Sequence, residues 1–297
     1  MQRRDFLATS MTAAASIPLA ASLAEAAQDS KTTVPAAGVT SDQPPRKGHI
    51  RHAVSQWCFG GMPLDELCRN ASAMGIEGID LLSENDWETP RKYGMLCSLA
   101  NGPTSISDGM NRLANHDRVV AECERMLPLA ANAGVPNLML FSGNRKGMSD
   151  DEGLKNCVIG LKRVMPLAEK HGVTILMELL NSRVDHGDYM CDRTPWGVEL
   201  VKRVGSDRFR MLYDIYHMQI MEGDVIRTIR DIHQYIGHYH TAGNPGRNEI
   251  DNTQELFYPP ICRAIIETGF KGFLAQEFIP RRDPMTSLRE SIDICDV

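Results

Sequence analysis

Short apolar runs alternate with amphipathic segments from about residue 50 to the end of the chain. The runs have the length of buried strands, and the segments between them repeat apolar residues at helical spacing. Strands are predicted near residues 50–57, 76–82, 94–100, 136–142, 173–179, 209–214, 236–241 and 271–277. Helices are predicted near residues 63–75, 111–134, 149–171, 194–204, 223–234, 257–268 and 284–295, with a poorly defined one near 86–93. This alternation indicates an α/β fold, a parallel sheet closed into a single (β/α)8 TIM barrel.

Glycines support the predicted ends of the helices. Gly75, Gly134, Gly172, Gly205 and Gly269 each follow a helical segment, where a left-handed residue commonly ends a helix. A doubly wound open sheet is the alternative arrangement of alternating strands and helices. It lacks support, because no GxGxxG turn follows the first strand.

The first 48 residues do not share this pattern. Residues 1–27 contain a twin-arginine pair followed by Asp-Phe-Leu, then a weakly apolar stretch that ends in Ala-Glu-Ala-Ala. This is the layout of a twin-arginine signal peptide, so we expect export to the periplasm by the twin-arginine machinery. A chance Arg-Arg in a cytosolic protein is the alternative. Residues 28–48 are polar and rich in Pro and Thr, which predicts a disordered linker before a TIM barrel domain over residues 49–297.

Four potential metal ligands end the last four predicted strands. Glu178, Asp214, His240 and Glu277 follow one another at intervals of 36, 26 and 37 residues. A single Glu after an apolar run is usually a solvated loop residue. In a TIM barrel, however, the strand ends meet at one rim, and a carboxylate buried there needs a partner. Three carboxylates and one imidazole predict one divalent metal ion, Mn²⁺ or Mg²⁺, with Co²⁺ as a further candidate.

Residues near these ligands are further candidates for the site. His238 shares a strand face with His240, which favours a supporting role beside the metal. Asn181 and Arg183 follow Glu178 on the rim loop and could reach a substrate. Either ordinary packing or an apolar wall of the pocket would explain Trp57, Phe59 and Trp196. A surface or structural position is expected for His52, His116 and His186.

The composition argues against binding to nucleic acid or to a membrane. The formal net charge is −6 and no basic patch is present, so nucleic acid is not an expected partner. No segment has the length and apolarity of a membrane span, so no stable membrane association is expected. The eight cysteines include no CxxC pair, which favours buried thiols, although an oxidising periplasm leaves a disulfide open. The sequence leaves the oligomeric state open.

Several of these residues lie in motifs that resemble a known family. The motifs are Asp-Ile-Tyr-His at 214–217, the run HTAGNPGRNE at 240–249, the strand-ending Glu178 and the Gln-Glu pair at 276–277. Together they resemble the hydroxypyruvate isomerase-like branch of the sugar isomerase/epimerase, or xylose isomerase-like, TIM barrels. The resemblance covers nearly all of residues 50–297.

The resemblance implies roles for individual residues. Glu178, Asp214, His240 and Glu277 would hold the metal, and the two glutamates would be the catalytic residues that exchange the substrate proton through an enediolate. His217 and Arg247 would contact substrate oxygens, and Trp57, Asn181 and Arg183 complete the substrate-binding candidates. Residues 181–193 depart from the isomerase pattern, and family members are typically cytosolic. These departures leave the substrate open.

The expected function is that of a metal-dependent isomerase of a small hydroxy-carbonyl or sugar substrate. Conversion of hydroxypyruvate to tartronate semialdehyde is the leading reaction. A ketose 3-epimerase, or an isomerase or dehydratase of the inosose type, is the alternative on the same metal site. An alternative from another class is a secreted sugar or sugar-acid binding protein with little turnover. A second glutamate argues against that alternative, because binding alone needs no second base.

Overall fold

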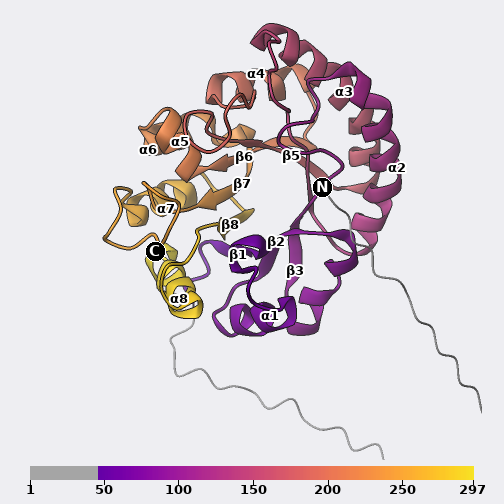
Figure 1. Ribbon diagram of the computed structural model, residues 1–297. Helices are drawn as coiled ribbons and strands as arrows, with labels where there is room; N and C mark the ends of the chain where they lie inside the picture. Colours follow the sequence, from indigo (N-terminus) through magenta and orange to yellow (C-terminus); the bar gives the residue numbers. More distant parts are fainter. Residues whose placement is uncertain (1–45) are drawn as a thin grey trace, which may run out of the picture. The chain divides into compact units, whose positions relative to one another are not determined.

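A closed barrel of eight parallel strands forms the centre of the structure (Figure 1). The computed structural model describes residues 46–297. Neighbouring strands pair in sequence order, and the first pairs with the last to close the barrel. The strands are β1 (Arg51–Ser55), β2 (Gly78–Leu82), β3 (Leu96–Ala100), β4 (Asn137–Met139), β5 (Thr174–Leu179), β6 (Phe209–Asp214), β7 (Ile236–Thr241) and β8 (Phe273–Gln276). The predicted TIM barrel is confirmed, and each strand lies within or close to its predicted range.

Helices surround the barrel on its outer side (Figure 1). They are α1 (Leu64–Ala73), α2 (His116–Asn132), α3 (Asp150–His171), α4 (Thr194–Val204), α5 (Ile215–Met221), α6 (Val225–Ile232), α7 (Tyr258–Glu267) and α8 (Pro284–Cys295). Short 3-10 turns are η1 (Gln56–Phe59), η2 (Glu84–Asp86), η3 (Thr89–Tyr93), η4 (Leu113–Asn115) and η5 (His233–Tyr235). Two details differ from the prediction. Only η2 and η3 connect β2 to β3, and the unpredicted helix α5 begins directly after β6.

Local sequence signals explain where the longest helix, α3, begins and ends. The Ser149 hydroxyl accepts a hydrogen bond from the Glu152 backbone N–H at 3.2 Å, and three acidic residues occupy the first turn. Both features stabilise the amino-terminal end of a helix. At the other end, Gly172 has a φ of 70°, a left-handed conformation that glycine adopts without strain.

Side chains alternate between the barrel interior and the surrounding helices along each strand. An apolar cluster inside the barrel is formed by Leu99, Met139, Leu176 and Leu212. Two residues further along β5 and β6 lie Glu178 and Asp214, which therefore share the inward face with Leu176 and Leu212. The interior is thus apolar at mid-height and acidic at the carboxyl end of the strands.

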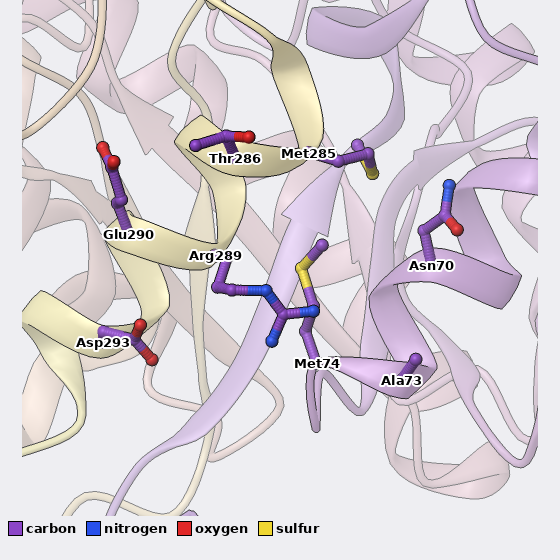
Figure 2. Close-up of a pocket in the computed structure, with 8 residues that line it drawn as sticks. All are labelled: Asn70, Ala73, Met74, Met285, Thr286, Arg289, Glu290 and Asp293. Carbon is purple, nitrogen blue, oxygen red and sulfur yellow. The ribbon is translucent and has the colours of Figure 1, made fainter. Parts of the chain in front are cut away.

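The chain enters the barrel between α1 and α8. The Arg46 guanidinium donates to the Met74 carbonyl at 2.8 Å and pairs with Asp293, so this residue of the predicted linker contacts the barrel. A groove of about 430 Å³ lies nearby between the two helices (Figure 2). It is lined by Asn70, Ala73, Met74, Met285, Thr286, Arg289, Glu290 and Asp293. None of these residues is a predicted metal ligand, so the groove is separate from the proposed chemistry.

Two further predictions concern targeting and cysteines. The predicted signal peptide, residues 1–27, and residues 28–45 of the linker lie outside the described residues. Within residues 46–297, no helix combines the length and apolarity needed to cross a membrane. All eight cysteines are free thiols, and seven of them are buried. The preference for buried thiols over a disulfide framework therefore agrees with the structure.

His52 on β1 is a buried histidine with an unusual environment. Its side chain is 1% exposed, and neither ring nitrogen has a hydrogen-bond partner among the described residues. Burial lowers its pKa from 6.5 to about 4, because the charged ring loses its hydration. His52 is therefore structural, one of the two roles expected from the sequence.

The buried imidazole should make the fold sensitive to acid. The unfolded chain binds a proton at His52 below pH 6.5, whereas the folded chain binds it only below about pH 4. The free energy of unfolding should therefore fall as the pH decreases through this window. We expect His52→Phe to remove up to about 1.4 kcal/mol per pH unit of this dependence. Urea unfolding between pH 7 and 4 measures it, with the exposed His233→Phe as the control; equal slopes for His52→Phe and wild type would contradict the prediction.

Candidate active site

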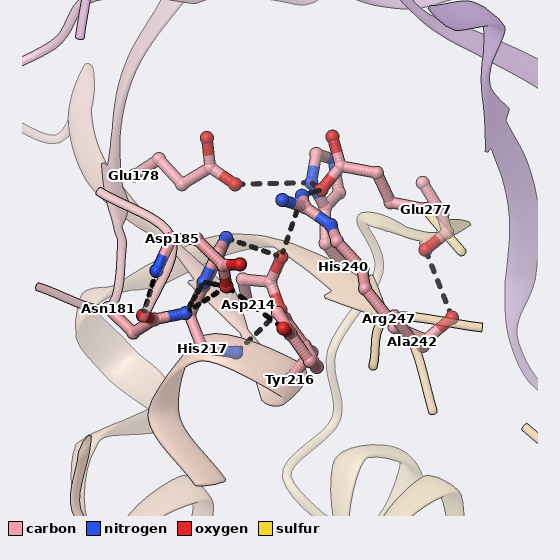
Figure 3. A network of polar contacts seen from close by, with 12 residues as sticks. Glu178, Asn181, Asp185, Asp214, Tyr216, His217, His240, Ala242, Arg247 and Glu277 are labelled. Carbon is pink, nitrogen blue, oxygen red and sulfur yellow. Dashed lines mark hydrogen bonds and ion pairs between the residues drawn. The ribbon is translucent and has the colours of Figure 1, made fainter. Parts of the chain in front are cut away.

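The four predicted ligands meet at the carboxyl end of the barrel (Figure 3). Glu178, Asp214, His240 and Glu277 are all buried, and one ligand atom from each lies within 4.8 Å of the other three. We call these residues the carboxylate cluster. They come from β5, β6 and β7 and from the residue after β8. Side chains separated by up to 99 residues in the sequence thus form one site, as the strand-end positions predict.

Local backbone structure orients two of the acids. Asp214 is both the last residue of β6 and the N-cap of α5, because its carboxylate accepts the His217 backbone N–H at 3.1 Å. Glu277 follows β8, and its backbone N–H donates to the Thr241 carbonyl at 2.9 Å. The neighbouring Gln276 points the other way and accepts the Thr241 hydroxyl at 2.7 Å. Strand alternation therefore separates the adjacent Gln and Glu onto opposite faces.

The environments of the three carboxyl groups differ. Burial, and then the charge of Glu277, raises the pKa of Glu178. Burial also raises the pKa of Asp214, to about 8, although Arg247 opposes this shift. Burial disfavours ionised Glu277 too, but His240, Arg247 and Trp57 together hold its pKa well below the usual range. The ionised form of Glu277 is therefore strongly stabilised, whereas nearby positive charge does not fully offset the cost of burying ionised Glu178 and Asp214.

The carboxylate cluster contains oxygen atoms that are available to bind a cation. Glu178 Oε1 and Asp214 Oδ2 are buried without a hydrogen-bond partner in the part of the chain that is described. His240 Nδ1 lies 3.4 Å from Glu178 Oε1 and 3.0 Å from Glu277 Oε2. Unpaired buried carboxylate oxygens are unfavourable unless a cation compensates them. Three carboxylates and one imidazole therefore fit a hard divalent metal ion.

Arg247 is the nearest cationic side chain to the cluster. Its Nη2 lies 2.6 Å from Glu277 Oε2 and 3.9 Å from Asp214 Oδ2. The guanidinium carbon lies 5.1 Å from the ring centre of Trp57 and 5.5 Å from that of Tyr216. Trp57 also donates from Nε1 to Glu277 Oε1 at 2.8 Å, and its side chain remains 41% exposed. Of the predicted substrate-binding residues, Arg247 and Trp57 therefore contact the cluster directly.

Two more of these candidates lie beside the cluster. Asn181 Nδ2 is 2.6 Å from His217 Nδ1, and His217 Nε2 is 3.7 Å from Asp214 Oδ2. Arg183 does not join them, because it is exposed and donates to the Ile220 carbonyl at 2.7 Å.

The other two apolar candidates, Phe59 and Trp196, make ordinary packing contacts. Phe59 is buried against Phe278, with ring centres 6.0 Å apart. Trp196 is on the outer helix α4 and donates to the Asp150 carbonyl at 3.1 Å. Ordinary packing, the alternative weighed for both residues, agrees with these contacts.

Asp80 on β2 supports the cluster and was not singled out from the sequence. Its Oδ2 lies 2.6 Å from His238 Nε2 and 3.1 Å from His240 Nε2, and Ser98 donates to Oδ1. His240 thus contacts Asp80 through one ring nitrogen and the cluster through the other. A carboxylate of this kind fixes the orientation of a ligating imidazole. The expected supporting position of His238 agrees with this arrangement. The missed signal is the same one used for the other acids, an acid within an apolar strand.

His116 and His186 were both expected to be surface or structural residues. His116 is buried and bonds to the Met110 carbonyl at 2.9 Å, a structural role as expected. His186 is half-buried, and its ring centre lies 5.2 Å from that of His217, beside the site. A surface or structural role was expected for His186, and its position beside His217 was not predicted. Its loop, residues 181–193, is the segment for which the sequence predicts a departure from the isomerase pattern.

Comparisons with known proteins agree with this architecture. The family model described as "Xylose isomerase-like TIM barrel" matches residues 68–296. The chain is 25% identical to a human protein named "Putative hydroxypyruvate isomerase" over 255 residues, which are 78% of this chain and 90% of that protein. It is 37% identical to a "2-oxo-tetronate isomerase" from Cupriavidus necator over 114 residues, 38% of this chain and 43% of that protein. The fold is similar to that of 3-keto-D-glucoside 4-epimerase from E. coli, with a TM-score of 0.70, 19% identity and coverage of 82% and 98% of the two chains.

Loss of the Arg247 charge should destabilise the metal-free fold. Arg247→Met keeps much of the side-chain volume but leaves Glu277 and Asp214 without this countercharge. Breaking a buried ion pair typically costs about 3–5 kcal/mol. Urea unfolding at pH 8 with a chelator present measures the loss.

The matched control is Arg282→Met. Arg282 pairs with three acids, Asp251, Glu290 and, at 3.9 Å, Glu249, but its side chain is 45% exposed. Its loss should change the free energy of unfolding by at most about 1 kcal/mol. Equal effects of the two substitutions would show that Arg247 does not compensate the buried carboxylates.

Proposed function

This chain belongs to the xylose isomerase-like TIM barrel family, and on that premise we propose that it is a metal-dependent isomerase of a small hydroxy-carbonyl substrate. The observation that carries the proposal is the carboxylate cluster, in which two glutamates face one another across a set of metal-type ligands within 4.8 Å. Such a pair suits removal and return of a proton.

The leading reaction is the conversion of hydroxypyruvate to tartronate semialdehyde. A relative named as a hydroxypyruvate isomerase, matched over 90% of its length, supports this substrate class. Arg247 adds a physical argument, because a guanidinium beside the cluster suits a substrate carboxylate. Ketoses and inososes lack that carboxylate, so they remain the alternative substrates for the same site.

Glu178, Asp214, His240 and Glu277 would hold a divalent cation, Mn²⁺ or Mg²⁺. When bound, the cation supplies polarisation of the substrate carbonyl and compensation of negative charge. Arg247 would orient the substrate, and the rings of Trp57 and Tyr216 near its guanidinium would limit the access of water. His217 lies close enough to Asp214 to contact a substrate oxygen at the cluster.

The environments of the two glutamates suit different roles in a proton transfer, one as an ionised carboxylate and the other as a protonated carboxyl group. His240, Arg247 and Trp57 hold the pKa of Glu277 well below the usual range, so Glu277 would be the glutamate that is ionised before the substrate binds. The pKa of Glu178 is raised, chiefly by burial, which favours a carboxyl group that can return a proton. Acid and base roles commonly follow such differences in environment.

We further propose that the protein is exported to the periplasm by the twin-arginine machinery. The twin arginines Arg3 and Arg4 and the small residues before position 28 support this proposal. Arg3→Lys with Arg4→Lys should retain the protein in the cytosol, as measured by fractionation and amino-terminal sequencing. Wild-type protein that keeps residues 1–27 in the cytosol would refute export.

The purified protein should contain one divalent ion per chain. Binding to the folded state should raise the free energy of unfolding by about 2.7 kcal/mol at a metal concentration 100 times the Kd. Glu178→Gln and Glu277→Gln should each weaken metal binding, as measured by elemental analysis and by titration of the metal-free protein. Glu255→Gln, an exposed substitution away from the cluster, is the control.

The same variants test the chemistry. Wild-type protein should exchange a C–H proton of hydroxypyruvate for solvent deuterium. Proton NMR or mass spectrometry measures this exchange, and the same assay is applied to a panel of ketoses. Each glutamate variant should lose about 10²–10⁴-fold in exchange rate, the usual contribution of a positioned acid or base. A wild-type protein that binds metal but exchanges no candidate substrate would favour the binding-protein alternative.

A further inference from the structure

The two ring nitrogens of His217 have different surroundings. The side chain is fully buried beside the carboxylate cluster (Figure 3). Its Nδ1 lies 2.6 Å from the side-chain amide nitrogen of Asn181. Its Nε2 has no hydrogen-bond partner within residues 46–297, and the nearest carboxylate oxygen, Asp214 Oδ2, is 3.7 Å away. One nitrogen is therefore held by the protein, and the other is free at the site.

The orientation of the Asn181 amide is determined by its other contacts. Its oxygen accepts the backbone N–H groups of Val184 and Asp185, both at 3.0 Å. Its nitrogen donates to Asp185 Oδ2 at 2.6 Å. A backbone N–H cannot accept a hydrogen bond and an ionised carboxylate cannot donate one. Rotating the amide by 180° would therefore lose all three hydrogen bonds.

A fixed amide nitrogen beside Nδ1 determines where His217 carries its proton. The amide N–H group can only donate, so Nδ1 must accept and must be unprotonated. A protonated Nδ1 would place two N–H groups 2.6 Å apart. The neutral ring therefore carries its single proton on Nε2, the nitrogen that is free at the site.

We propose that Asn181 is a positioning residue that holds His217 in the Nε2–H form, so that His217 donates a hydrogen bond to the substrate oxygen that gains negative charge. This inference rests on the proposed isomerase function and specifies the ligand chemistry at one position. A neutral N–H donor selects a carbonyl oxygen or the oxyanion formed from it. The distance of 3.7 Å to Asp214 Oδ2 exceeds that of a hydrogen bond, so the donor is not already engaged.

Asp185 and Tyr216 complete the arrangement. The Tyr216 hydroxyl donates to the same Asp185 oxygen that Asn181 contacts, at 2.9 Å. The loop after β5 is thus tied to α5, which carries His217. A donor aimed at developing charge stabilises the transition state more than the ground state. Loss of the donor should therefore lower kcat more than it raises KM.

The first measurement is the protonation of His217 in the wild-type protein loaded with Mg²⁺. Nitrogen-15 NMR of histidine-labelled protein distinguishes protonated from bare ring nitrogens, and His217→Gln assigns the signal. We expect a bare Nδ1 and a protonated Nε2. A proton on Nδ1, alone or together with one on Nε2, would overturn the proposal. Because the wild-type spectrum gives this answer, a misfolded variant does not remove the test.

The second measurement uses Asn181→Asp, which keeps the side-chain shape but replaces the amide donor with an acceptor. Nδ1 should then become protonated. The rate of deuterium exchange at saturating substrate should fall by about 10²–10³-fold, the usual loss for one donor to an oxyanion. KM and Mg²⁺ affinity should change much less. Loss of Mg²⁺ affinity in parallel with the rate would indicate a merely structural role and contradict the inference.

Two control variants distinguish the effect of a changed local charge from the effect of a changed His217 tautomer. Asp185→Asn alone removes the neighbouring carboxylate but leaves Asn181 in place, so the Nε2–H form should persist. Asn181→Asp combined with Asp185→Asn keeps the number of acids and amides but moves the acid next to Nδ1, so the tautomer should change. A wild-type protein without exchange would refute the proposed function and the donor role, while its spectrum would still report separately on Asn181.

Discussion

The burial of three carboxylates at one end of a barrel is the constraint on which the rest of the site depends. Glu178, Asp214 and Glu277 cannot all be ionised in an apolar interior without positive charge beside them. The described residues provide two such groups, the imidazole of His240 and the guanidinium of Arg247, both within 4.0 Å of cluster oxygens. Two carboxyl oxygens still lack a hydrogen-bond partner among those residues. This remaining imbalance explains why the donor set suits a divalent cation.

A polar connection crosses the barrel to hold this arrangement. It begins at Ser98 on β3, passes through Asp80 on β2 to His240 on β7, and reaches Glu277 after β8. Close packing makes the connection possible, because an added Cβ on Gly78 would lie 2.3 Å from the Ser98 hydroxyl oxygen. The strand interior is therefore shaped around a polar contact below the site. The position of the imidazole thus depends on strands that carry none of the predicted ligands.

Periodicity and strand-end acids predicted much of the molecule. The eight strands and the four members of the carboxylate cluster follow from alternation and from the common direction of parallel strands. Helix α5 was missed because Ile215–Met221 continues the apolar run of β6, and only the Asp214 cap separates strand from helix. Asp80 carries the same signal, an acid within an apolar strand, but it lies in the middle of β2 rather than at the strand end, where the ligands were sought. Arg183 and Asn181 are two residues apart on one loop, and only the folded backbone decides which faces the site.

Under the proposed function, the loop after β5 and the carboxylate cluster would have separate roles. The carboxylate cluster lies on strand ends that the closed barrel holds in place, so its geometry depends little on the loops. Asn181 and His186, in contrast, belong to the loop of residues 181–193, in which the Asp185 carboxylate accepts hydrogen bonds from the side chains of Asn181 and Tyr216. Substitutions in this loop would then alter which oxygen of a substrate meets the ring of His217, without moving a proposed metal ligand. We therefore expect the loop to govern the choice of substrate and the cluster to govern the type of reaction.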